Sequence, residues 1–108
     1  MAEPRAHVSS VGSGAEVDPE TLAVAAVFVE SRASATRPFP AGARELSGMD
    51  PDTVTEVGEV LLGKHPGRTS DTEITVYKST GHASEDLAAA AVVYRAALAG
   101  QVGTRVTI

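Results

Sequence analysis

The chain has 108 residues and a formal net charge of −5, which fits one small domain and argues against a nucleic-acid partner. It contains no cysteine, which excludes a disulfide framework, a cysteine-ligated zinc site and a thiol nucleophile. Its longest apolar run, residues 22–29, is too short to cross a bilayer, so we expect a cytoplasmic α/β protein without a membrane partner.

The first quarter of the chain predicts a strand, a short helix and a second strand. Residues 7–11 form a short strand pattern that ends before a glycine-containing turn. Asp18 is a suitable helix N-cap and Pro19 follows at the first helical position, so a short helix should run to about residue 24. Residues 26–30 are mostly β-branched or aromatic, and the polar pair Glu30-Ser31 closes the segment, which indicates a buried strand.

The middle of the chain alternates between loop and regular patterns. Prolines and glycines break residues 31–52 into loop, with one helical turn expected around residues 43–46. Residues 53–62 place apolar side chains at helical spacing, and a glycine follows them. Residues 64–71 are polar and should be loop, whereas residues 73–78 alternate polar and apolar side chains, as in a strand.

The best-defined helix is predicted over residues 84–98, with Ser84 as its N-cap and acidic residues in its first turn. One face carries an apolar stripe that could seat a partner helix, although packing within the chain's own core is the simpler explanation. The stripe consists of Leu87, Ala90, Ala91, Tyr94 and Leu98. Residues 104–108 predict a last strand, and the order of elements predicts an α/β layer fold.

One glycine motif resembles a dinucleotide-binding turn. Gly12 and Gly14 follow a predicted strand and precede a helix, and Glu30 stands where a ribose-binding acid would lie. However, Val17 occupies the place of the third glycine, and the helix begins late, after Asp18. We therefore expect an ordinary strand-to-helix loop.

Other kinds of site have little support. His7, His65 and His82 lack the spacing of a metal site, so we expect no metal. The arginines are dispersed and lack interleaved aromatic residues, so no nucleic-acid surface is expected. No serine lies in a nucleophile elbow.

Four segments in the second half of the chain carry a resemblance to a known family. They are EVGEVL at residues 56–61, GRTSD at 67–71, EITVYKSTG at 73–81 and EDLAAA at 85–90. In this order they resemble the C-terminal part of the ornithine cyclodeaminase/mu-crystallin family. HVSSVG at residues 7–12 resembles the family's late strand in the nucleotide-binding domain, and GTRV at 103–106 resembles its closing strand.

The resemblance implies a fold, a reaction class and partners. The fold is the late portion of a three-layer Rossmann-like domain over residues 6–81, followed by a helix and strand over 84–108 that would return to a dimerisation domain. The activity is NAD(P)-dependent conversion of a small amino acid or cyclic imine. Ornithine conversion to proline with loss of ammonia, ketimine reduction and alanine dehydrogenation all occur in the family. A homodimer or a complementary chain is the implied protein partner.

The same resemblance assigns four positions. Gly12 and Ser13 match the loop near the nicotinamide, Ser79 matches a cofactor-contacting residue, and Thr80 matches a residue facing the substrate. These assignments fit general principles, because ligands of open α/β sheets bind at the carboxyl ends of strands. The alternative for Ser79 and Thr80 is an ordinary turn before the last helix.

Two departures from the family limit the expected activity. The family's loop segment with a catalytic aspartate and a lysine is missing, so no catalytic residue is named. Glu16 is the nearest unexplained carboxylate, either a substitute or a solvated loop charge. The glycine-rich pyrophosphate turn and the substrate-binding arginine and lysine would lie upstream of Met1. We therefore expect the isolated chain to bind NAD(P) weakly and to be inactive. The alternative is a non-catalytic binding or assembly protein, either a mu-crystallin-like ligand binder or a truncated remnant.

Overall fold

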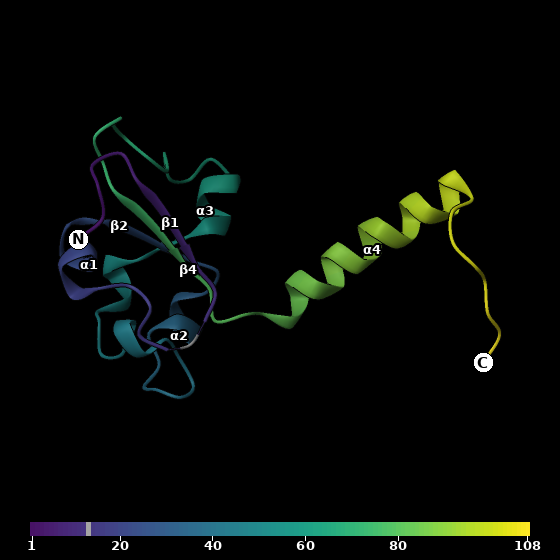
Figure 1. Cartoon of the computed structure of the whole chain (residues 1–108), viewed down its shortest axis with the longest axis horizontal. Helices are drawn as coiled ribbons and strands as arrows, with labels where there is room; N and C mark the ends of the chain where they lie inside the picture. The colour runs from purple at the N-terminus through teal and green to yellow at the C-terminus, as the bar shows by residue number, and fades with distance from the viewer. Residues whose placement is uncertain (13) are drawn as a thin grey trace.

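A parallel sheet of four short strands forms the centre of the computed structural model, which describes residues 1–12 and 14–108 (Figure 1). The strands are β1 (His7–Ser10), β2 (Ala26–Val29), β3 (Thr55–Glu56) and β4 (Thr75–Lys78). Their spatial order is β1-β4-β2-β3, so the last strand in the chain lies between the first two. The α/β fold class with a parallel sheet is therefore confirmed.

One face of the sheet is buried under the N-terminal half of the chain. Helices α1 (Pro19–Val24) and α2 (Arg32–Ala35) and the 3-10 turn η1 (Arg44–Leu46) each place an apolar side chain against it. Alternate strand residues point to this face because the side chains of a strand repeat with a period of two. The buried cluster consists of Val17, Val27, Val29, Ala35, Ala43, Leu46, Val54 and Val76.

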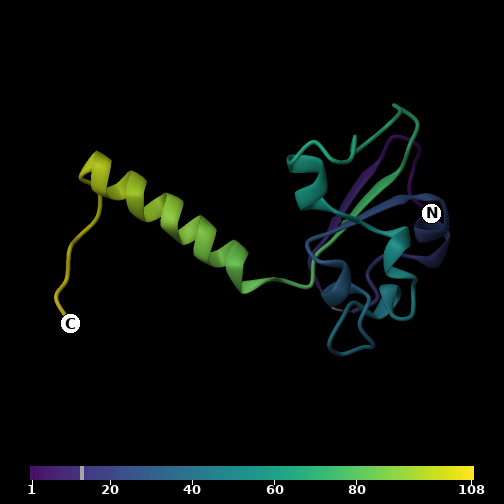
Figure 2. The ribbon, with the colours of Figure 1, turned by 180° about the vertical axis from the view of Figure 1, so that it is seen from behind.

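The opposite face of the sheet is only partly covered (Figure 2). The short helix α3 (Val57–Leu61) lies over this face and leaves a shallow groove beside it. Phe28 and Thr75 of the sheet and Val60 of α3 are among the residues that line the groove. Helices therefore lie on both sides of the sheet, which makes three layers.

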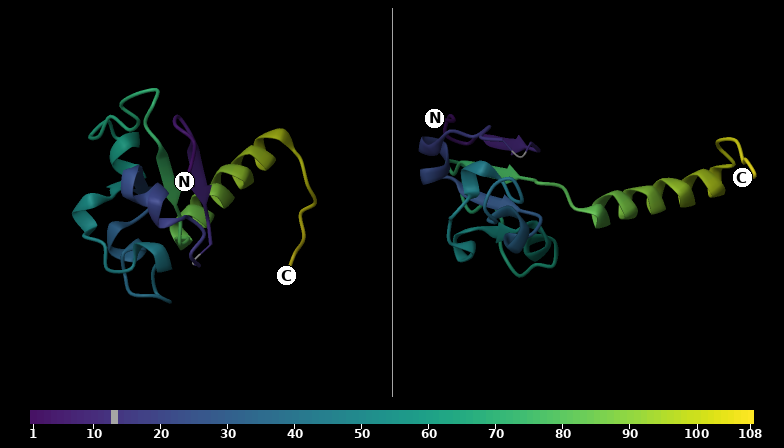
Figure 3. Two further views of the ribbon diagram at one scale, coloured as in Figure 1. Left: turned by 60° about the vertical axis from the view of Figure 1, so that its left-hand side comes forward. Right: turned by 90° about the horizontal axis from the view of Figure 1, so that it is seen from below.

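Helix α4 (Ala83–Gly100) projects away from the sheet, and none of its residues is buried (Figures 1 and 3). The radius of gyration is 17.0 Å, whereas a compact chain of this length would have about 13 Å. Among the described helices, none is both long and apolar enough to span a membrane.

Several local predictions are confirmed. Asp18 is the N-cap of α1, since its carboxylate accepts the Thr21 N–H at 2.8 Å, and the helix ends at Val24. A helical turn occurs near residues 43–46, as η1. The strands predicted over residues 7–11, 26–30 and 73–78 exist as β1, β2 and the shorter β4.

The helix predicted over residues 53–62 is wrong for its first half. Residues 51–53 form a second 3-10 turn, η2 (Pro51–Thr53), and Thr55 and Glu56 pair with β2 as β3. The helical spacing is real only from Val57, where a capping box between Glu56 and Glu59 starts α3. Pairing with a neighbouring strand has therefore overridden the local pattern.

The C-terminal predictions need three corrections. The N-cap of α4 is His82, whose Nδ1 accepts the Ser84 N–H at 3.4 Å, and Ser84 lies inside the helix. The apolar stripe does not pack into the chain's own core, because Leu87, Tyr94 and Leu98 are exposed. Residues 104–108 form no strand, since no neighbouring strand in the described part of the chain pairs with them.

Candidate functional site

The carboxyl ends of β1, β4 and β2 meet at one edge of the sheet. In the strand register, Ser10 of β1 stands opposite Lys78 of β4, which stands opposite Val29 of β2. The Ser79 N–H donates to the Ser10 carbonyl at 2.9 Å, which extends this pairing by one residue. Gly12, which follows β1, and Thr80, which follows Ser79, are therefore placed at the same edge.

Lys78 is fully buried at this edge and its ammonium group is surrounded by acceptors. Its Nζ lies 2.7 Å from Ser10 Oγ, 2.8 Å from Glu45 Oε1 and 3.3 Å from Glu16 Oε2. Only 4% of the Glu45 side chain is exposed, and its Oε2 makes no hydrogen bond with the described residues. A buried charge requires such partners, because burial without them is strongly unfavourable.

Glu16 joins this buried lysine to the loop after β1. Its carboxylate accepts hydrogen bonds from the Ser10 hydroxyl and from the Gly12 N–H, the latter at 3.0 Å. These two bonds, followed by that from Lys78, lower the pKa of Glu16. Glu16 is therefore a loop charge that remains partly exposed to solvent but also accepts several hydrogen bonds. Its low pKa also makes it a poor general acid near neutral pH.

The Glu16 carboxylate occupies the space where a side chain at residue 12 would begin. A Cβ atom added to Gly12 would overlap the Glu16 carboxylate. Glycine at this position thus permits the carboxylate to close over the loop. Ser13, which was assigned together with Gly12, lies outside the described residues.

Glu30 binds the two residues that follow β4, Ser79 and Thr80. Its Oε1 accepts the Thr80 N–H at 2.7 Å, the Thr80 hydroxyl at 3.0 Å and the Ser79 hydroxyl at 3.4 Å. Glu30 Oε2 is buried without a hydrogen bond from the described residues. Ser79 is buried and Thr80 is half-buried, so they form a firmly held turn that ends at Gly81.

The dinucleotide-binding motif tested with Gly12, Gly14 and Glu30 is excluded by the sheet order, in agreement with the expectation of an ordinary loop. That motif needs adjacent first and second strands, whereas β4 separates β1 from β2. The N-terminus of α1 is also unsuited to a phosphate, because the Asp18 carboxylate already accepts the Thr21 N–H and hydroxyl. The start of α1 therefore offers no cradle for an anion.

Lys78 and Glu45 were missed by reasoning from the sequence. The signal for Lys78 was present, because it follows Val76 by two residues and must share its buried face. Glu45 gave no comparable signal. Its position depends on how η1 packs Leu46 into the core, and the sequence does not reveal that contact.

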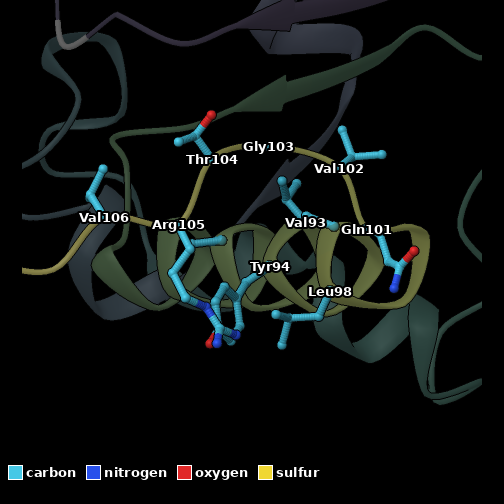
Figure 4. Close-up of a pocket in the computed structure, with 11 residues that line it drawn as sticks. Val93, Tyr94, Leu98, Gln101, Val102, Gly103, Thr104, Arg105 and Val106 are labelled. Atoms are coloured by element: carbon cyan, nitrogen blue, oxygen red, sulfur yellow. The ribbon is translucent and has the colours of Figure 1, made fainter.

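A wide groove elsewhere in the chain does not contribute to this edge. It lies between α4 and the C-terminal segment, with Tyr94 and Leu98 on the helix and Val102 and Val106 on the segment (Figure 4). These side chains are exposed, so the groove is an open surface.

Comparisons with known proteins place the chain among NAD-binding relatives. The model of the ornithine cyclodeaminase/mu-crystallin family matches residues 1–101. The ketimine reductase mu-crystallin of Mus musculus is 40% identical over 96 residues, which is 85% of this chain and 29% of the relative. The chain spans only about a third of the length of the curated relatives that it matches.

Two solved structures resemble the fold closely. An archaeal alanine dehydrogenase dimer with bound NAD superposes with a TM-score of 0.73 at 34% identity, over 99% of this chain and 35% of that one. The Δ1-pyrroline-2-carboxylate reductase of Thermococcus litoralis, in complex with NADH and L-proline, gives a TM-score of 0.75 at 29% identity. That match covers 96% of this chain and 34% of the reductase.

Proposed function

This chain belongs to the ornithine cyclodeaminase/mu-crystallin family, and we propose on that premise that it forms the nicotinamide side of an NAD(P)-dependent enzyme. The proposed substrate is a small amino acid or a cyclic imine. Relatives named as a ketimine reductase and as a pyrroline-carboxylate reductase bound to NADH and L-proline support this class. We propose that the enzyme acts in the cytoplasm.

The observation that carries the proposal is the meeting of the β1 and β4 ends. It brings Gly12 and Ser79, which are 67 positions apart, to one edge of the sheet, where the Ser79 N–H bonds to Ser10. We assign Gly12, Ser13 and Ser79 to contact with the cofactor and Thr80 to the substrate. When bound, the nicotinamide supplies hydride transfer, and the protein's task is to orient it against the substrate carbon.

The residues at this edge fit the nicotinamide half of the cofactor better than its phosphates. We assign the hydroxyls of Ser79 and Thr80, which Glu30 orients, and the main chain of Gly12 to contact with a flat ring. The acidic cap of α1 disfavours an anion at the start of that helix. The phosphates are therefore proposed to bind elsewhere in the complete enzyme.

The complete enzyme is proposed to need more than this chain. Residues 6–81 would form the late part of the nucleotide-binding domain, while α4 and residues 101–108 would pack against a dimerisation domain. Exposed apolar side chains on α4, such as Leu87, Val93 and Leu98, support that role. The covering surface would come from a second copy or a complementary chain, and we propose that the isolated chain is inactive.

A non-catalytic binding or assembly role is the second candidate. The observation that favours it is Glu16, because hydrogen bonds from Ser10, Gly12 and Lys78 already occupy its carboxylate. Assays of NADH consumption with Δ1-pyrroline-2-carboxylate address this candidate. Turnover by the isolated chain would contradict both the binding role and the proposed inactivity.

The proposed cofactor site can be tested by NMR titration of the 15N-labelled chain. Reduced nicotinamide mononucleotide and NADH should shift the amide resonances of Gly12, Ser79 and Thr80, whereas AMP should leave them unchanged. Ser79→Ala should weaken the response, and Ser70→Ala, a matched change at an exposed serine of the loop that precedes β4, should not. Unchanged spectra with both nicotinamide compounds, or an equal response to AMP, would contradict the proposal.

A further inference from the structure

We infer that Lys78 and Glu16 are positioning residues. Together they fix the start of the connection between β1 and α1, here called the Gly12 loop, against the end of β4. The inference rests on the proposed function for its purpose, since Gly12 and Ser79 are the residues assigned to the cofactor. Lys78 and Glu16 are assigned no contact with cofactor or substrate. Their proposed role is to fix the positions of Gly12 and Ser79, which are assigned such contacts.

The starting observation is the cost of burying Lys78. Its side chain has no exposed surface, and a lysine in that position is unfavourable unless its charge is compensated. Three side chains compensate it, namely Ser10 from β1, Glu45 from η1 and Glu16 from the loop. Lys78 directly precedes Ser79, so these contacts connect three separate segments to the carboxyl end of β4.

The contacts form a continuous path from β4 to the loop. Lys78 Nζ contacts Glu16 Oε2 at 3.3 Å, and the same oxygen accepts the Gly12 N–H at 3.0 Å. The Lys78 ammonium also contacts the Gly14 carbonyl at 3.4 Å. On the backbone side, Ser79 is bonded to Ser10. The Gly12 loop and Ser79 are thus joined by one backbone bond and one ionic path.

The two carboxylates around Lys78 differ in a way that matters for this role. Glu45 is almost fully buried, whereas 48% of the Glu16 side chain is exposed. If Glu16 is removed, Glu45 and Ser10 still satisfy the buried ammonium group. Loss of Glu16 should therefore release the loop without unfolding the sheet, which separates positioning from general stability.

The test compares three variants of the full chain by hydrogen exchange. Glu16→Ala removes the acceptor, Glu16→Gln keeps an acceptor without the charge, and Glu20→Ala is the matched control at an exposed glutamate of α1. We expect exchange of the Gly12 amide to become about tenfold faster in Glu16→Ala, as for loss of a charge-assisted hydrogen bond. Glu16→Gln should lie between, and Glu20→Ala should match the wild type.

The Val76 amide in the centre of β4 reports general stability. Its exchange should be accelerated far less than that of Gly12 in the two Glu16 variants, and it should match the wild type in Glu20→Ala. Equal acceleration at Gly12 and Val76 would mean that Glu16 merely stabilises the fold, and an unchanged Gly12 rate would mean that it does not hold the loop. Either result would overturn the inference. Lys78→Met should accelerate Gly12 exchange in the same way, and if that variant unfolds, Glu16→Ala still decides.

Titration with reduced nicotinamide mononucleotide keeps this inference distinct from the proposed function. If the wild type responds, Glu16→Ala should bind several-fold more weakly and Glu20→Ala equally well, and unchanged affinity in Glu16→Ala would overturn the positioning role. If the wild type itself gives no response, the proposed function fails. The exchange rates of Gly12 and Val76 then decide by themselves whether Lys78 and Glu16 hold the loop.

Discussion

The Glu16 carboxylate accepts more hydrogen bonds than the carboxylate of any other exposed glutamate among the described residues. The Ser10 hydroxyl, the Gly12 N–H and the Lys78 ammonium all point to Oε2, although nearly half of the side chain is exposed. These donors favour the ionised form. The charge state of this one residue therefore links a buried lysine to a surface loop.

This link predicts a pH dependence of stability. The pKa of Glu16 is lowered in the folded chain by the hydrogen bonds from Ser10, Gly12 and Lys78, in that order. A group of this kind stabilises the fold above its unfolded-state pKa and loses that contribution as the pH falls through its folded-state pKa. The free energy of unfolding should therefore decrease below about pH 4, and Glu16→Gln should reduce that decrease.

Urea unfolding of wild type and Glu16→Gln, measured at matched pH values from neutral to acidic, provides the measurement. Asp18 and Glu59 also have lowered pKa values and contribute equally to both proteins, so the difference between the two curves isolates Glu16. Parallel curves over the whole range would show that the Glu16 carboxylate adds nothing to the fold.

Among the elements, the three-residue turn η1 contributes both to the hydrophobic core and to the edge of the sheet. Leu46 is fully buried in the core cluster, while its neighbour Glu45 reaches Lys78 at 2.8 Å. The turn thus joins the hydrophobic core to the strand edge. A substitution of Leu46 in the core should consequently disturb the contact between Glu45 and the buried Lys78 as well.

Leu46→Ala should lower the free energy of unfolding by about 3 kcal/mol, because it removes a buried side chain and leaves a cavity. Leu61→Ala is the matched control, since Leu61 of α3 is 82% exposed, and it should cost less than about 1 kcal/mol. Urea unfolding at neutral pH gives both values. A Leu46→Ala variant as stable as Leu61→Ala would mean that η1 does not pack as described.

On the scale of the whole molecule, the chain has a packed α/β body and a helix that buries nothing. Helix α4 has no buried residue, and large apolar side chains on it, among them Leu87, Val92 and Tyr94, are exposed. Burial of apolar surface is the main source of folding free energy. The body should therefore be as stable without α4 as with it.

Removal of residues 83–108 should leave the urea midpoint of the remaining chain unchanged, and it should reduce self-association by removing exposed apolar surface. Unfolding curves and sedimentation of the shortened and full chains measure both effects. A clearly lower midpoint for the shortened chain would show that α4 packs on the body in solution.

The sequence predicted the class of fold and much of the local structure. Asp18 and Pro19 predicted the start of a helix, and α1 begins there. The alternation of apolar residues near Val76 predicted a strand, and β4 confirms it. The candidate site was predicted less completely. Gly12, Ser79 and Thr80 were named by resemblance and do meet at one edge, but the buried Lys78 and Glu45 beside them were not named.

What the sequence by itself determined are features that depend on near neighbours, such as caps, turns and the alternation of apolar residues, because these act over two to four positions. Only the tertiary structure decided the sheet order and the surroundings of Lys78. Its partner Ser10 is 68 residues away in the chain, and Thr55 became a strand because β2 lay beside it. A residue's pairing and burial depend on which distant segment packs against it, and no local pattern encodes that choice.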